Sequence, residues 1–240
     1  MKILILGGTT EARELANRLV ADGHDVITSL AGRTRDPKLP QGGIRMGRFG
    51  GIPGLAAYLN AAGIEALVDA THPYAGQISV NAVAAAEASG VPLVRVMRPG
   101  WEPLPGQRWT IVDTLAEAAL SLPTGAEVLL TTGHSGLGHF LERDDCHFIV
   151  RLIEPPEMEL PSHAELLLSR PPYGVDGEIE LMQRRSVTHL VTKNSGGGQT
   201  AGKLEAAHKL GVTVIMIGRP HYGPALEVAS VDAAVDALGL

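Results

Sequence analysis

Apolar runs alternate with segments of helical periodicity along almost the whole chain. In the first half, this pattern predicts strands at residues 2–6, 24–31, 65–71 and 91–97, and helices at 11–22, 53–62 and 76–89. The strands are continuous Val/Ile/Leu runs and do not alternate with polar residues. Such runs are typical of a parallel sheet that helices cover on both faces.

A Pro- and Gly-rich segment at 98–108 interrupts the pattern, which then resumes. Strands are predicted at 109–112, 127–132, 146–153, 188–193 and 212–218, and helices at 113–121, 136–143, 176–185, 200–210 and 231–238. The fold class is therefore α/β, with two Rossmann-like parallel-sheet domains. We predict a first domain at 1–98 and a second at 99–240.

Four predicted strands end in threonine with glycine or a polar residue beside it. These ends are Gly7-Gly8-Thr9, Asp69-Ala70-Thr71, Thr131-Thr132-Gly133 and Thr192-Lys193-Asn194. Ligands of open α/β sheets bind outside the carboxyl ends of the strands. These four segments therefore indicate a ligand site.

The first strand end resembles the dinucleotide-binding pattern G-x-G-x-x-G/A. Gly7 occupies the first glycine position, Thr9 replaces the second glycine, and Ala12 ends the pattern. Backbone N–H groups at the start of the following helix can face a pyrophosphate. A plain strand-to-helix turn that binds nothing is the alternative.

The second predicted strand is followed by Gly32, Arg33 and Arg35, with no acidic residue before Asp36. An acid at this place accepts the ribose 2′-hydroxyl of NAD, whereas an arginine accommodates the 2′-phosphate of NADP. Because a guanidinium binds phosphate through two parallel hydrogen bonds, the sequence favours NADP. Ordinary surface arginines are the alternative.

Two further segments carry polar residues that could line a site. His72, in the segment Asp69–Ala75, is a candidate proton donor, with a structural loop histidine as the alternative. The letters GGQTAGKL at 197–204 approach a P-loop, but Leu204 lacks the hydroxyl that binds Mg²⁺. We interpret this part of the chain instead as a polar cluster at 193–197, with Thr200 near the start of the next helix.

Composition excludes several classes of protein. A net charge of −6 and an aromatic content of 4% argue against a nucleic-acid binder. The single cysteine, Cys146, suits a reducing compartment, and the histidines and this cysteine form no metal-binding pattern. The first apolar run is too short for a signal peptide, and no run has membrane length. We expect a cytoplasmic protein without a metal.

Four motifs together resemble one known family. LGGTTEAR (6–13), DATHPYA (69–75), TKNSGG (192–197) and K-x-x-A-A-x-x-L-G-V-x-V-x-M-I-x-R-P (203–220) are similar to the precorrin-6A reductase (precorrin-6x reductase) family of cobalamin biosynthesis. The resemblance extends from about residue 3 to residue 220. Pro172-Tyr173 departs from a Gly-Pro-Phe-like segment expected in the family.

The resemblance implies an oxidoreductase of corrin metabolism that uses NADPH to reduce one double bond of precorrin-6A, giving precorrin-6B. It also implies an active site in the cleft between the two Rossmann-like domains. The cobalt-precorrin-6A reductase of the anaerobic branch is an alternative, and a non-catalytic dinucleotide-binding module is a second one. The implied partner is precorrin-6A or its cobalt form, with neither nucleic acid nor membrane. Transient contacts with neighbouring enzymes of the pathway are compatible with this role.

The strand ends and the family motifs together give the candidate site residues. Those for cofactor binding are Gly7, Gly8, Thr9, Glu11, Gly32, Arg33, Thr71, His72, Thr132, Gly133, Lys193, Ser195, Gly196 and Thr200. The catalytic candidates are Lys193, His72 and Tyr74, with water as an alternative proton donor. The substrate carries many carboxylates, so we expect about half of the cations at or near strand or loop ends to contact a ligand, the others being ordinary surface charges. These cations are Arg95, Arg98, Arg151, Arg170, Lys193, Lys203 and Arg219.

Overall fold

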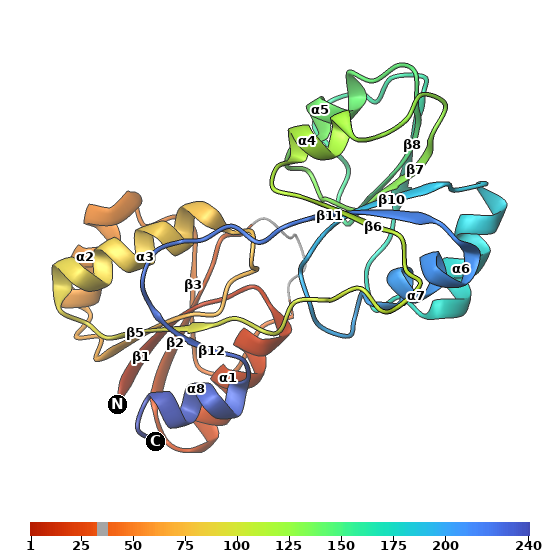
Figure 1. The fold of residues 1–240 in the computed structure, drawn as a ribbon. Coiled ribbons are helices and arrows are strands. Elements are labelled where there is room, and N and C mark those ends of the chain that lie inside the picture. The colour runs from red at the N-terminus through yellow and green to blue at the C-terminus, as the bar shows by residue number, and fades with distance from the viewer. Residues whose placement is uncertain (33–37) are drawn as a thin grey trace. The chain divides into compact units, whose positions relative to one another are not determined.

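The computed structural model describes residues 1–32 and 38–240. The chain forms two compact units (Figure 1), of which the first comprises residues 1–99 and 220–240 and the second residues 100–219. Each unit is an α/β domain with its own six-stranded sheet, in which all neighbouring strands are parallel. This confirms the predicted fold class of two Rossmann-like sheets.

The first unit contains the strand order of a dinucleotide-binding fold. Its strands are β1 (Lys2–Leu6), β2 (Asp25–Leu30), β3 (Gly43–Met46), β4 (Ala66–Asp69), β5 (Leu93–Val96) and β12 (Leu226–Val228), and its helices are α1 (Thr10–Ala21), α2 (Gly51–Ala61), α3 (Gly76–Ser89) and α8 (Val231–Ala237). The spatial order β3-β2-β1-β4-β5-β12 is the 3-2-1-4-5-6 order of a Rossmann fold, with β12 as the sixth strand.

Alternate residues of β1 are buried on opposite faces of this sheet. Ile3 and Ile5 pack into the core beneath α1 and α8, whereas Leu4 and Leu6 pack against α2 and α3. Figure 1 shows the two helix pairs on the two faces. Because both faces are covered, the strand is apolar throughout, as the sequence pattern predicted.

The predicted domain boundary needs one correction. The division after Pro99 lies one residue from the predicted one, but residues 220–240 belong to the first unit and not to the second. The reason is that β12 pairs in parallel with β5, and α8 packs on α1. The last helix-period segment therefore completes the sheet with which the chain began.

A buried arginine joins the returning segment to this sheet. Arg95 on β5 is 2% exposed, and its Nε donates to Asp69 on β4 at 3.2 Å. Its Nη1 donates to Glu227 on β12 at 3.2 Å and to the carbonyl of Gly223 at 3.3 Å. One guanidinium thus links three neighbouring strands and the segment that precedes the last of them.

The second unit has the order β6-β11-β10-β7-β8-β9. Its strands are β6 (Trp109–Val112), β7 (Glu127–Leu130), β8 (His147–Leu152), β9 (Ala164–Leu168), β10 (His189–Lys193) and β11 (Thr213–Ile217), and its helices are α4 (Leu115–Leu120), α5 (Leu137–Leu141), α6 (Val175–Arg184) and α7 (Gly202–Leu210). Leu129, Ile149 and Leu190 pack beneath α6 and α7. Figure 1 shows α4 and α5 on the opposite face.

Three short strands, β3, β9 and β12, were not predicted. All three lie at sheet edges and keep several exposed residues, so they lack the continuous apolar run that marks a central strand. Among the described residues, no helix combines the length and the apolar character needed to cross a membrane.

We predict that Arg95→Met destabilises the first unit by about 3–5 kcal/mol, because it leaves the buried carboxylate of Asp69 without its cation. The measurement is urea unfolding followed by circular dichroism. Both tryptophans, Trp101 and Trp109, lie in the second unit, so their fluorescence serves as a separate probe that should shift less.

Glu227→Gln is the matched control for this substitution. The Glu227 side chain is 53% exposed, so its loss should lower the free energy of unfolding by less than about 1 kcal/mol. A loss for Arg95→Met no larger than that of the control would contradict a central role of the buried pair.

Candidate functional site

The glycine turn after β1 is built for close packing against β2. A Cβ atom at Gly7 would lie 2.8 Å from Cγ2 of Thr28, too close for any side chain. The Gly7 N–H donates to the carbonyl of Ser29 at 2.9 Å, which extends the pairing of β1 with β2 into the turn. Gly8 follows with φ +117°, a conformation that L side chains rarely adopt. Gly7 is therefore required by its packing against Thr28, and Gly8 by its backbone conformation.

Thr9 has two structural roles that explain why it replaces the second glycine of the motif. Its hydroxyl caps α1 by accepting the N–H of Ala12 at 3.1 Å. The same hydroxyl donates to the carbonyl of Ala70 at 2.8 Å, which joins the end of β1 to the end of β4. Because the Thr9 hydroxyl is used in these two hydrogen bonds, a ligand at this turn would bind to the backbone N–H groups at the start of α1.

The next strand end is held by Asp69. One of its carboxylate oxygens accepts the hydroxyl of Thr71 at 2.7 Å and the Thr71 N–H at 3.2 Å. The other oxygen accepts Nε of Arg95. The buried ion pair therefore determines the position of Thr71 and of the loop that follows.

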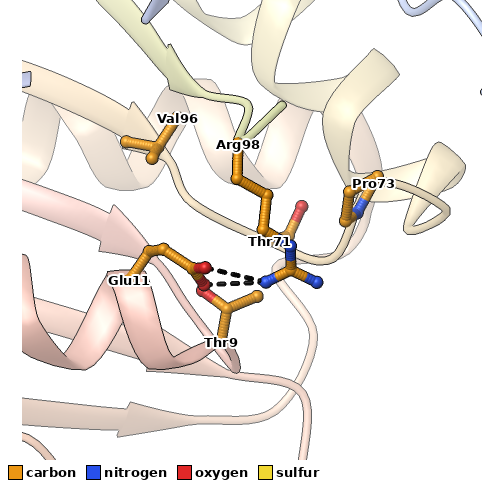
Figure 2. Close-up of a pocket in the computed structure, with 6 residues that line it drawn as sticks. All are labelled: Thr9, Glu11, Thr71, Pro73, Val96 and Arg98. Carbon is orange, nitrogen blue, oxygen red and sulfur yellow. Dashed lines mark hydrogen bonds and ion pairs between the residues drawn. The ribbon is translucent and has the colours of Figure 1, made fainter. Parts of the chain in front are cut away.

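A small pocket lies at the carboxyl ends of β1, β4 and β5 (Figure 2). Its lining residues are Thr9, Glu11, Thr71, Pro73, Val96 and Arg98. The crossovers from β1 and from β4 run in opposite directions along the sheet, so the pocket lies at the topological switch point, where open α/β sheets bind ligands. The structure thus places Thr9, Glu11 and Thr71, three of the residues predicted to bind a cofactor, around one pocket.

The charge of Glu11 in this pocket is compensated. Nη1 of Arg98 donates to its two carboxylate oxygens at 3.0 and 2.8 Å, as Figure 2 shows. An uncompensated carboxylate in the first turn of α1 would repel a phosphate group. Because Arg98 neutralises it, the positive end of the helix remains compatible with an anion.

His72 and Tyr74 lie on the loop after β4. The exposed His72 accepts the Tyr74 N–H at Nδ1 over 3.3 Å, and the two ring centroids are 5.8 Å apart. Between them, the carbonyl of Pro73 accepts the hydroxyl of Tyr222 at 2.8 Å. The returning C-terminal segment therefore supports this loop, which the sequence analysis did not anticipate.

The end of β2 is described only as far as Gly32, which has φ +72°. The predicted 2′-phosphate ligand Arg33 lies outside the described residues, as does Arg35. Their predicted role stays a prediction.

The second unit has a corresponding switch point between β7 and β10, where Thr132 and Lys193 meet. Nζ of Lys193 donates to the carbonyl of Thr132 at 2.7 Å, and burial lowers the pKa of the amine. Thr132 is 3% exposed, and its hydroxyl has no hydrogen-bond partner among the described residues. Gly133 follows with φ +74°. Two of the predicted residues from distant parts of the chain are thus in direct contact.

The loop after β10 is anchored at Asn194. Its amide oxygen accepts the Trp101 N–H at 2.7 Å, and its amide nitrogen donates to the Trp101 carbonyl at 3.0 Å. Nε of Arg219 donates to the Asn194 carbonyl at 2.7 Å. Ser195 and Gly196 follow directly, and Gly196 has φ +68°. Asn194 thus holds the loop in place, a role the sequence analysis did not assign.

The glycine-lysine pair at 202–203 begins α7, as expected from the sequence, and Thr200 lies two residues before that helix. Lys203 is 4% exposed, and its Nζ lies 5.1 Å from the ring centroid of Trp101. A P-loop lysine must instead reach phosphates outside the helix. The burial of Lys203 adds a structural reason to reject that function.

Arg151 and Glu178 form an ion pair near Lys203, with both side chains 4% exposed. The Arg151 guanidinium also lies 4.0 Å from the ring centroid of Tyr173. Burial, with the nearby charge of Arg151, lowers the pKa of Lys203 to about 7. Of the cations expected to meet substrate, Arg95 and Arg151 are therefore already committed to buried carboxylates.

Comparison with known proteins shows to which family the chain belongs. Residues 2–239 match the family described as precorrin-6x reductase CbiJ/CobK. The chain belongs to this family.

Individual members of the family are similar over nearly their whole length. The precorrin-6A reductase of Rhodococcus erythropolis is 49% identical, over 94% of this chain and 92% of the relative. The cobalt-precorrin-6A reductase of Priestia megaterium is 30% identical, with 92% of each chain covered. A solved structure described as CobK precorrin-6A reductase is 39% identical, with a TM-score of 0.93, and covers 100% of this chain and 96% of its own.

We predict that the stability of this family member rises with pH in a window set by Lys203. Between about pH 7 and pH 10.5 the unfolded chain carries the Lys203 proton and the folded chain does not, so the free energy of unfolding increases with pH. The slope should reach about 1.4 kcal/mol per pH unit. Lys203→Met should lower the slope by the contribution of this one group, as measured by urea unfolding at several pH values.

The control for this prediction is Lys209→Met on the same helix. Lys209 is half exposed, and its pKa is raised by Glu205, so it titrates above this window. Wild type and Lys209→Met should share one slope. An equal slope in Lys203→Met would show that the buried amine does not titrate as stated.

Proposed function

We propose that this protein reduces one double bond of precorrin-6A with NADPH, giving precorrin-6B in cobalamin biosynthesis. The observation that carries the proposal is family membership over residues 2–239. The solved structure described as CobK precorrin-6A reductase supports it, because it has the same fold over the whole chain, with a TM-score of 0.93. The expected cytoplasmic location and the transient contacts with neighbouring pathway enzymes belong to the same proposal.

The first unit contains a site whose residues fit a dinucleotide. Gly7 and Gly8 allow close approach of the backbone, α1 begins directly behind them, and Arg98 neutralises Glu11. We assign the pyrophosphate to this turn, and the 2′-phosphate to the end of β2 near Gly32 and Arg33. When bound, NADPH supplies the hydride for the reduction.

The second unit supplies the candidate proton donor. The pKa of Lys193 is lowered by burial, so its ammonium group releases a proton more readily than an exposed lysine does. Its contact with Thr132 holds the amine at the strand end. His72 and Tyr74 are the remaining candidates from the first unit. The shared cleft expected from the sequence stays a prediction.

The metal-free substrate is favoured over its cobalt form by sequence similarity. The relatives named precorrin-6A reductase are 42–49% identical to this chain. Those named cobalt-precorrin-6A reductase are 28–30% identical. We therefore propose precorrin-6A as the substrate and keep its cobalt form as the second candidate.

The direct test supplies each tetrapyrrole with NADPH or NADH and follows oxidation of the nicotinamide by absorbance. We expect the fastest oxidation with NADPH and precorrin-6A. Faster oxidation with the cobalt form would assign the protein to the other branch. Binding of NADPH without oxidation in the presence of either substrate would instead show a non-catalytic dinucleotide-binding module.

A second prediction concerns Arg33. Arg33→Ala should weaken NADPH binding by about tenfold or more and leave NADH binding nearly unchanged, because only NADPH carries the 2′-phosphate. Dissociation constants from isothermal titration calorimetry measure both effects. Equal losses for the two nucleotides would remove the assignment of Arg33 to the 2′-phosphate.

A further inference from the structure

A second arginine lies beside the end of β2. Arg45 on β3 is in register with Ser29 on β2, and the next strand in the sheet is β1, which leads into the glycine turn. The Gly47 N–H donates to the Leu30 carbonyl at 2.9 Å, just as Gly7 donates to Ser29 on the other side of β2. Arg45 therefore lies at the same carboxyl end of the sheet as the end of β1, with only β2 between them.

The guanidinium of Arg45 is held in one orientation. Its Cζ lies 3.7 Å from the ring centroid of Phe49 and 5.4 Å from that of Tyr58. Nη1 donates to the carbonyl of Gly47 at 2.7 Å and to the hydroxyl of Ser29 at 3.4 Å. Nη2 donates to the carbonyl of Arg48 at 2.8 Å. Such fixation lowers the entropy lost when a ligand binds.

The positive charge of Arg45 is not neutralised by these contacts. All three hydrogen-bond acceptors are neutral oxygens, and no ion pair found within residues 1–32 and 38–240 includes Arg45. A guanidinium has five N–H donors, and these bonds use three of them. The side chain is half-buried, so a fixed cation with donors to spare faces the end of β2.

The end of the second strand is where a Rossmann fold receives the adenosine ribose, and an arginine there accommodates a 2′-phosphate. We propose that Arg45 is a fixed cation of the 2′-phosphate site and contributes to the choice of NADPH over NADH. This inference rests on the proposed function. Arg45 is thus a second candidate for this site besides Arg33. It lies on a regular strand, and its guanidinium is already oriented without a ligand.

The test is calorimetric binding of 2′,5′-ADP and 5′-AMP to the full-length protein, since the two probes differ in the 2′-phosphate. Arg45→Gln should weaken binding of 2′,5′-ADP about 10- to 100-fold, the range of a hydrogen bond between charged groups, and leave 5′-AMP binding within about twofold. Arg45→Lys keeps the charge without the planar fork and should give an intermediate loss.

Arg18→Gln is the matched control. It removes one positive charge from the same unit, near the C-terminal end of α1, where Arg18 pairs with Asp232. It should bind both probes as wild type does. Equal weakening of both probes by Arg45→Gln would show a purely structural role and overturn the inference, as would unchanged binding of 2′,5′-ADP. A wild-type protein without preference for 2′,5′-ADP over 5′-AMP would contradict NADPH as the cofactor itself.

Discussion

The first unit depends on one buried guanidinium. Arg95 holds Asp69 on one side and the returning strand β12 on the other, and Asp69 in turn holds Thr71 at the rim of the pocket. A single buried ion pair therefore connects the closure of the sheet to the geometry of the candidate site. Removing either partner would leave an uncompensated charge in the interior, which is far more costly than the loss of an exposed pair.

Two kinds of environment occur among the described arginines near the strand ends. Arg95 and Arg151 are buried against carboxylates, and each stabilises a junction between elements. Arg45 instead donates to neutral oxygens at the carboxyl ends of β2 and β3, so its positive charge remains available to an anion. Residue type alone does not distinguish an arginine that is paired inside the fold from one whose charge is available to a ligand.

Both units place their candidate residues by the same rule. Where neighbouring crossovers leave in opposite directions, the segments that follow the two strand ends diverge and leave a crevice for a ligand. In the first unit this point brings Thr9 next to Ala70, and in the second it brings Lys193 next to Thr132. Small and polar residues occur at these ends because side chains elsewhere on the sheet are covered by helices.

The sequence by itself determined the central strands, the glycine turn and the family. Continuous apolar runs mark strands that are covered on both faces, so a local pattern is sufficient to predict the central strands. The residues of each motif are adjacent in the chain, so a local pattern also predicts the glycine turn and the family. Only the tertiary structure decided that residues 220–240 complete the first sheet, that β3, β9 and β12 form edges, and that Lys203 is buried. Edge strands are short and half exposed, and a strand's partner can lie far along the chain, as β5 and β12 do. Strand pairing and burial of this kind depend on contacts between segments that are distant in the chain, so a local sequence pattern cannot predict them.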